Sequence, residues 1–239
     1  TRTLVKDKVA PTLAIHDPLM IDNIVNNSEQ AAVVISGTSN AEDNQDVTLT
    51  ITGSTIIIVT ATITGGDWTQ TVDISTLADG NIAITADVSD LAGNPATQAP
   101  KTVAKDAALP TLAIDDLLMT DDIVNDVEQA AVVISGTSNA EDNQTVTLTI
   151  TDGSTTINAT ATVTGGVWTQ TAYMTTLADG TVTITADVSD LAGNPATQAT
   201  GTLNKDTVYP TLTIDNNLMG DDWVNTAEMT AVVINGTTD

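Results

Sequence analysis

The sequence predicts an all-β protein built from tandem β-sandwich units of about 100 residues each. One reason is a fixed repeat: Pro11, Pro110 and Pro210 lie 99 and then 100 residues apart, and Trp68 and Trp168 lie 100 residues apart. Another is that short runs of β-branched residues alternate with polar residues, which is the pattern of half-buried strands. Gly, Asn, Asp and Pro separate these runs, which is typical of turns between strands.

The first four expected strands of the first complete unit are bounded by turn residues. Segment 12–15 follows Pro11, and segment 32–36 runs into a loop rich in Ser, Asn and Asp. Segments 47–52 and 56–63 consist mainly of Val, Ile and Thr and are separated by a Gly-Ser turn. This composition between turn signals predicts four strands.

The last three expected strands each follow a glycine-containing turn. Segment 68–74 follows Gly-Gly-Asp, segment 81–88 follows Ala-Asp-Gly, and segment 96–103 follows Asp-Leu-Ala-Gly-Asn. Seven strands without a strong helical period predict an immunoglobulin-like β-sandwich. Because the chain has no Phe, we expect Trp68 and Trp168 to fill the space between the sheets and not to bind a ligand.

The repeat also sets the expected domain boundaries, which are 1–7 (the tail of a preceding unit and its linker), 8–106, 107–206 and a partial third unit at 207–239. The partial unit carries only the first two strands, and two strands cannot cover the apolar run at 231–234. We therefore expect 207–239 either to be tied to strands of another chain or to be loosely ordered. Trp223 is expected to pack and not to recognise a ligand.

Composition excludes several functions. The net charge of −25 argues against nucleic acid and anionic membranes as partners. No apolar run reaches the roughly eighteen residues that a membrane-spanning helix needs. Without Cys, the chain has no disulfide, thiolate nucleophile or cysteine metal site. Its single histidine, His16, stands alone at an expected surface position, and the paired acidic residues recur in the same loops of every unit, so we expect no enzyme.

Strand directions bring acidic loops to the junctions between units. If successive strands alternate in direction, the loops after the first, third and fifth strands lie at the C-terminal pole, and the other loops lie at the N-terminal pole. At the first junction this brings together carboxylates and amides from both units and the linker, namely Asp22, Asn26, Glu29, Asp79, Asp106, Glu141, Asp142, Asp190 and Asn194. Calcium takes about six to eight such oxygen ligands in flexible geometry.

Calcium is therefore the expected cofactor, because so many carboxylates at one pole repel one another unless a cation lies between them. The alternative is that these residues are turn formers and solvated charges, which applies most strongly to Asp79 before Gly80. The expected ligands are Asp7, Asp22, Asn26, Glu29, Asp79, Asp90, Asn94, Asp106, Asp116, Asp121, Asn125, Glu128, Asp179, Asp190, Asn194, Asp206, Asp221 and Glu228.

Six motifs recur in the same order within the units: Lys-Asp-x-x-x-Pro-Thr-Leu, Asp-Asp-Ile-Val-Asn-x-x-Glu, Val-Val-Ile-Ser-Gly-Thr, Gly-Gly-x-Trp-Thr, Leu-Ala-Asp-Gly and Val-Ser-Asp-Leu-Ala-Gly-Asn. Together they resemble the bacterial Ig-like repeats of giant surface adhesins and biofilm-associated proteins, which are exported by type I secretion. The resemblance implies stiff extender modules on the bacterial cell surface, with calcium at or near the linkers. The family's calcium nonapeptide and its terminal adhesive domains do not appear in this sequence.

Three functions remain open from the sequence. The leading one is a calcium-stiffened structural extender whose partners are the neighbouring repeats of its own chain. A second is a ligand-binding adhesion module for glycan or protein, but loop 36–45 is copied without change at 135–144, whereas binding arrays usually vary their loops. A third is a self-assembling filament in which other copies of the chain complete the partial unit by strand exchange.

Overall fold

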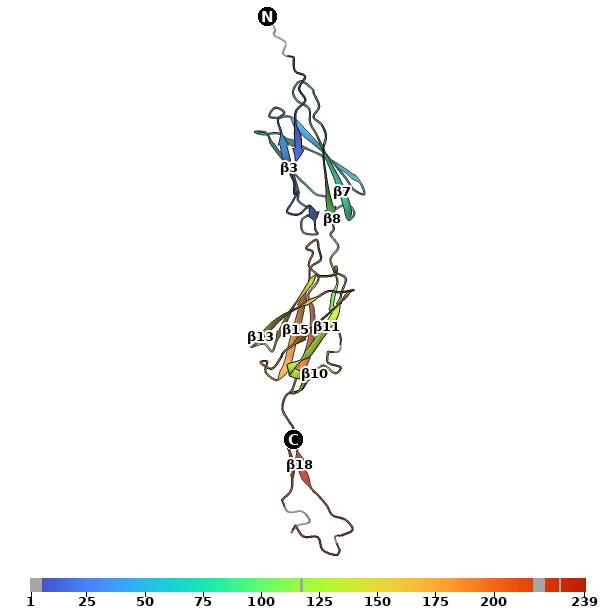
Figure 1. Ribbon diagram of the computed structural model, residues 1–239, viewed down its shortest axis with the longest axis vertical. Coiled ribbons are helices and arrows are strands. Elements are labelled where there is room, and N and C mark those ends of the chain that lie inside the picture. Colours follow the sequence, from blue (N-terminus) through green and yellow to red (C-terminus); the bar gives the residue numbers. More distant parts are fainter. Residues whose placement is uncertain (1–5, 117, 217–221, 228) are drawn as a thin grey trace.

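The computed structural model describes residues 6–116, 118–216, 222–227 and 229–239. Two β-sandwich repeats are stacked end to end along the longest axis of the molecule, followed by a shorter segment at the C-terminal end (Figure 1). Almost all of the named elements are strands, so the prediction of tandem β-sandwiches is confirmed. In the described ranges, no helix is long and apolar enough to cross a membrane.

The first repeat consists of a small and a large sheet. The small sheet has the order β1-β3-β6 and contains β1 (Leu13–Ile15), β3 (Val33–Ser39) and β6 (Asp67–Val72). The large sheet has the order β2-β8-β7-β4-β5 and contains β2 (Ile24–Val25), β4 (Asp46–Thr52), β5 (Ile56–Thr62), β7 (Gly80–Asp87) and β8 (Ala99–Lys105). Neighbouring strands are antiparallel except for β2 and β8, which are parallel.

The second repeat copies this arrangement. Its small sheet has the order β14-β11-β9 and contains β9 (Leu112–Ile114), β11 (Val132–Ser138) and β14 (Val167–Ala172). Its large sheet has the order β10-β16-β15-β12-β13 and contains β10 (Ile123–Val124), β12 (Thr145–Thr151), β13 (Thr156–Thr162), β15 (Gly180–Asp187) and β16 (Ala199–Lys205). A short 3-10 turn, η1 (Glu128–Ala130), follows β10.

The core of each repeat follows from the alternation in its strands. In β4, Val47, Leu49 and Ile51 point inward and are fully buried, while the threonines between them face outward. Burying one such side chain contributes roughly 1.5–3 kcal/mol, so a few alternating strands supply most of the driving force for the fold.

One tryptophan lies at the centre of each sandwich, as the sequence predicts. Trp68 and Trp168 are each 2% exposed. The indole of Trp68 packs so close to β3 that a Cβ on Gly37 would lie 2.3 Å from its Cζ2 atom and 2.0 Å from the carbonyl oxygen of Ala14. Only glycine fits at this position, and Gly136 meets the same restriction in the second repeat.

The two-residue strands β2 and β10 are not predicted by the sequence. Ile24 and Val25 pair in parallel with Ala104 and Lys105 at the end of β8, and the side chain of Val25 is fully buried. This pairing carries the chain to the C-terminal pole, so residues 26–30 begin directly beside the linker. The last strand also begins later and ends later than the sequence analysis expects, at Ala99–Lys105.

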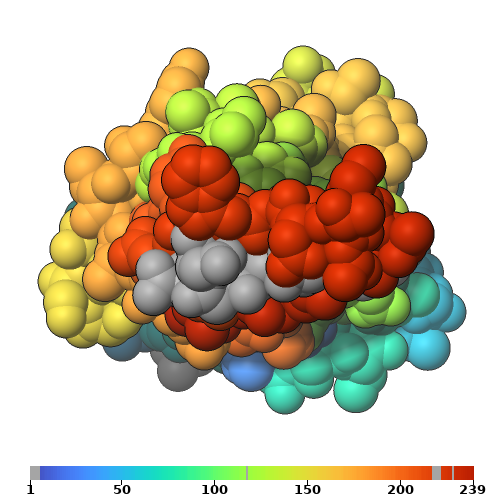
Figure 2. Space-filling view, turned by 90° about the horizontal axis from the view of Figure 1, so that it is seen from below, coloured from blue at the N-terminus to red at the C-terminus, as the bar shows by residue number. Residues whose placement is uncertain are grey.

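The C-terminal segment pairs β17 (Leu212–Ile214) with β18 (Gly236–Thr238) in the register that joins β1 to β3. It lies at the front in a view from the C-terminal end, where it is red (Figure 2). Ile234 is 66% exposed and Trp223 is 78% exposed, so the expectation that Trp223 packs was wrong. The described part of this segment supplies two strands only, which leave the indole without a second sheet. Whether strands of another chain cover the segment stays a prediction.

Candidate functional site

The loop at the C-terminal end of the first repeat is a single helical turn with a capping box. The Asn26 carboxamide oxygen accepts the N–H groups of Ser28 and Glu29 at 2.9 and 3.2 Å, and Glu29 Oε2 accepts the N–H of Asn26 at 3.1 Å. This reciprocal pair is the standard way to satisfy the free N–H groups of a first turn. Asn125 and Glu128 form the same pair in the second repeat. The Asn-x-x-Glu motif therefore has a structural role whether or not a metal is bound.

A second loop, residues 190–194, projects from the N-terminal end of the second repeat toward this turn. Asp190 closes the loop on itself, because its two carboxylate oxygens accept the backbone N–H of Asn194 at 2.8 Å and its side-chain amide at 2.9 Å. Gly193 adopts a φ of +85°, which favours glycine. Glu141 accepts the N–H of Leu191 at 2.9 Å and fixes the loop from below.

The same loop occurs at residues 90–94 of the first repeat. Asp90 accepts the same two bonds from Asn94, and the bond from the Asn94 side chain is the main reason that the pKa of Asp90 lies below its ordinary value. The loop is therefore a property of each repeat and not of the junction.

Asn194 connects the two repeats and the linker. Its carboxamide oxygen accepts the N–H of Asn27 at 2.7 Å, and its amide donates to the carbonyl oxygen of Asp106 at 2.9 Å. A third bond crosses the junction from the amide of Asn26 to the carbonyl oxygen of Ala192 at 3.2 Å. Asn194 is 1% exposed. The loop in Figure 1 that reaches up from the second repeat thus contacts both the turn that begins at Asn26 in the first repeat and the linker.

Asp79 anchors the linker to the first repeat. Its carboxylate accepts Lys105 Nζ at 2.7 Å and the N–H of Ala107 at 3.1 Å. The bond from Lys105 is the main reason that the pKa of Asp79 lies below its ordinary value. The Lys105 side chain is 4% exposed, so Asp79 balances a buried charge. Asp179 and Lys205 repeat this pair at the second junction, where Thr207 also donates to Asp179.

The structure brings together only part of the expected ligand set. The side chains of four expected ligands and the main-chain carbonyl of a fifth, Asp106, belong to one hydrogen-bonded network at the first junction, and the four are Asn26, Glu29, Asp190 and Asn194. The others have local partners or lie apart from this network, and Asp221 and Glu228 lie outside the described residues. A bond to the N–H two residues further on is made by Asp7, Asp22, Asp121 and Asp206. A lysine pairs with each of Asp79 and Asp179, and Asp90 bonds Asn94 at the far pole. Asn125 belongs with Glu128 to the second turn, and Asp116 is exposed.

The donor chemistry of the first junction fits a hard cation, although no site is preformed. Within the described ranges, no three His, Asp or Glu side chains are grouped closely enough to hold a metal ion. In the same ranges, Glu29 and Asp106 each use only one carboxylate oxygen as a hydrogen-bond acceptor, which leaves the other oxygen available. Both oxygens of Asp190 are used by Asn194, so that carboxylate would have to exchange a partner.

The second junction has the same turn and linker. Asn125, Asp126 and Glu128 line a hollow of about 400 Å³ together with residues 206–210. Here the Tyr209 hydroxyl donates to the carboxylate of Asp126, which raises the pKa of Tyr209. At the first junction, the loop 190–194 covers the corresponding surface.

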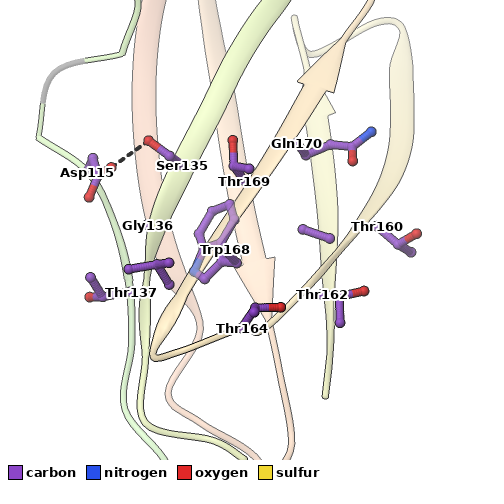
Figure 3. Close-up of a pocket in the computed structure, with 12 residues that line it drawn as sticks. Asp115, Ser135, Gly136, Thr137, Thr160, Thr162, Thr164, Trp168, Thr169 and Gln170 are labelled. Atoms are coloured by element: carbon purple, nitrogen blue, oxygen red, sulfur yellow. Dashed lines mark hydrogen bonds between the residues drawn. The ribbon is translucent and has the colours of Figure 1, made fainter. Parts of the chain in front are cut away.

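A separate groove of about 630 Å³ lies beside the edge strands β13 and β14 (Figure 3). Five threonine side chains line it, and a hydrogen bond joins Asp115 to Ser135 at its rim. An equivalent groove in the first repeat has His16 hydrogen-bonded to Ser36 in that place. Since Trp168 is almost fully buried, the groove offers no exposed aromatic face.

Sequence reasoning missed two partners at the junctions. Asn27 contributes only its backbone N–H, so no side-chain pattern identifies it. Lys105 had a usable signal, because the pair Lys-Asp recurs before each unit and a lysine at the end of a buried strand requires a counter-ion. Its partner Asp79 lies 26 residues away, and only the fold brings the two together.

Comparison with known proteins identifies the family of these repeats. The family model described as the bacterial Ig-like domain matches residues 20–107 and 118–207. No curated protein matches the chain.

Several solved structures of adhesins are similar. One is a Ca2+-stabilised adhesin that helps an Antarctic bacterium reach out and bind ice. It is 28% identical, has a TM-score of 0.55, and the match covers 98% of this chain and 58% of that one. Another comes from a 1.5-MDa bacterial ice-binding adhesin, with 23% identity, a TM-score of 0.51, and coverage of 98% and 77%. A tetra-tandem repeat from the extending region of a large adhesion protein is 25% identical with a TM-score of 0.41, and the match covers 96% of this chain and 63% of that one.

Proposed function

Because this chain belongs to the bacterial Ig-like domain family, we propose that it is an extender segment of a bacterial cell-surface adhesin. Its role is to hold a binding tip away from the cell in adhesion or biofilm formation. The observation that carries this proposal is the end-to-end contact in which loop 190–194 bonds the last turn of the preceding repeat and the linker. These contacts support neighbouring repeats of the same chain as its proposed partners. Export by type I secretion to the cell exterior fits this role.

We further propose that calcium stiffens the junction. Glu29 and Asp106 would hold the ion through their available oxygens, and Asp190 would join them by exchanging a bond to Asn194. When bound, calcium supplies positive charge among carboxylates from two repeats and the linker. Support comes from the oxygen-rich donor set, from the net charge of −25, and from the calcium stabilisation named for the similar adhesin.

Chelation is expected to lower the melting temperature of the chain. An ion that binds only the assembled junction stabilises it by mass action, by about 2.7 kcal/mol at a hundred times its dissociation constant. This corresponds to a shift of several degrees for a domain of this size. Calorimetry in calcium and in EGTA measures the shift.

Matched variants locate the site. Glu29→Gln combined with Asp106→Asn should abolish the calcium shift, whereas Asp22→Asn should retain it, because Asp22 lies at the same pole but outside the network. The same melting temperature of the wild type in calcium and in EGTA would contradict the proposal that calcium stabilises the junction.

The grooves beside the edge strands favour a second candidate, a ligand-binding adhesion module. Their threonine hydroxyls suit a glycan or an extended peptide. Saturable binding of a glycan to the chain, lost on Gln170→Ala and Thr162→Val in the groove, would favour this candidate over the extender.

A further inference from the structure

Two identical loops in this chain have different surroundings, and the difference isolates one residue. The sequence Asp-Leu-Ala-Gly-Asn occurs at 90–94 and at 190–194, and in both loops the asparagine bonds the aspartate in the same way. Among the described residues, the Asn94 side chain bonds only Asp90, and Asn94 is half-buried. Asn194 makes two more, across the junction, and is 1% exposed.

We propose that Asn194 is a positioning residue that holds the two repeats in line without any metal ion. The inference deepens the extender function and rests on it, since it concerns the same junction. Calcium, where it binds, adds to an alignment that Asn194 already sets.

The geometry of the bonds gives Asn194 this capacity. Its oxygen takes an N–H from the first repeat, and its two amide hydrogens go to a linker carbonyl and to Asp190. One planar group therefore joins three segments. Asp190 holds the side chain in place from within the loop, so little rotational freedom is lost when the junction forms.

An amide also suits the charge of this junction. Glu29, Asp106 and Asp190 belong to the three segments that Asn194 joins, and a charged side chain in place of Asn194 would add to the negative charge of these segments. The neutral Asn194 side chain crosses the gap by bonding backbone groups, and burial protects these bonds from competition with water.

The test uses the full chain, which contains no cysteine of its own. Thr60→Cys and Thr160→Cys introduce exposed labelling sites on β5 and β13 for paired spin labels. The distribution of distances between the labels is measured in EGTA for the parent, for Asn194→Ala and for Asn94→Ala. Asn94→Ala is the matched control, because it removes the same bonds within the loop and none across the junction.

The parent in EGTA should give a narrow distribution that Asn94→Ala leaves unchanged, and Asn194→Ala should broaden it at least about twofold. Asn27→Pro is a second variant for the case in which Asn194→Ala unfolds its loop. Of the bonds across the junction it removes only the N–H that Asn194 accepts, at the first position of a turn where proline is tolerated. It also removes the Asn27 carboxamide oxygen, which accepts Gln30 Nε2 within the turn. It should broaden the distribution as Asn194→Ala does.

The outcomes separate this inference from the calcium proposal. A distance distribution of the parent in EGTA that is as broad as that of Asn194→Ala would overturn the proposal that Asn194 holds the repeats in line. If calcium then narrowed the parent's distribution, the calcium site would still be supported. Unchanged distributions in both Asn194→Ala and Asn27→Pro would also overturn it. A narrow distance distribution for the parent in EGTA, together with broad distributions for Asn194→Ala and Asn27→Pro, supports the proposed role of Asn194 even if calcium changes nothing.

Discussion

Replacing Trp168 by Ala should unfold the second repeat while the first repeat stays folded. The indole is 2% exposed and lies in a core that contains no other aromatic side chain. Truncation of a buried Trp to Ala costs about 3–5 kcal/mol, which is a large part of the stability of a domain of this size. Since the two cores are separate clusters, the loss should stay within one repeat.

Calorimetry of the full chain should resolve this as one early transition and one unchanged transition. Trp168→Phe should cost less than Trp168→Ala, since among the described residues the buried Nε1 atom has no hydrogen-bond partner to lose. Trp223→Ala is the matched control, because that indole is 78% exposed. A single transition that moves as a whole would contradict the independence of the two cores.

Asp79→Ala should destabilise the first repeat by leaving the ammonium group of Lys105 buried without its counter-ion. Bonds to charged groups contribute about 1.5–3 kcal/mol, and we expect the lower part of this range because the Asp79 side chain is 42% exposed. The linker should also loosen, since the N–H of Ala107 loses its acceptor.

The double variant Asp79→Ala with Lys105→Met should recover much of the loss, because an apolar chain of similar shape replaces the unpaired charge. The pH dependence provides a second check. The bond from Lys105 lowers the folded pKa of Asp79 below 3.8, so the contribution of the pair is present above about pH 3.8 and is lost as the pH falls through the folded pKa. A stability difference between the wild type and Asp79→Asn that does not shrink as the pH falls below 3.8 would contradict this origin.

The sequence predicted the sandwich because its information is local. Val47, Leu49 and Ile51 alternate with threonines, and this pattern alone indicates a half-buried strand. The short strand β2 escaped prediction because two residues carry no periodicity and its partner β8 lies about 80 residues further along the chain. A strand defined by such a distant contact cannot be recognised from its own composition.

The sequence predicted at which end of each repeat the candidate site lies, but not which partners its residues bond. Alternating strand directions placed Glu29, Asp106 and Asp190 at one junction, and all three belong to the network there, Asp106 through its main-chain carbonyl. The same reasoning included Asp22 and Asp79, which instead bond a backbone N–H and a lysine. Charge repulsion suggested that a cation must join the repeats, whereas the direct contacts run through the amides of Asn26 and Asn194. Such contacts depend on side-chain geometry that spacing does not specify.

The most direct test of the junction as an aligning element is small-angle scattering of the full chain. The wild type in calcium is compared with the triple variant Glu29→Gln, Asp106→Asn and Asn194→Ala in EGTA, which lacks both proposed connections. We expect an elongated wild type whose distance distribution shows two separated maxima, and a shorter and smoother distribution for the variant. Identical curves for the two samples would mean that Glu29, Asp106 and Asn194 do not set the alignment of the repeats, which contradicts the proposed role of this junction.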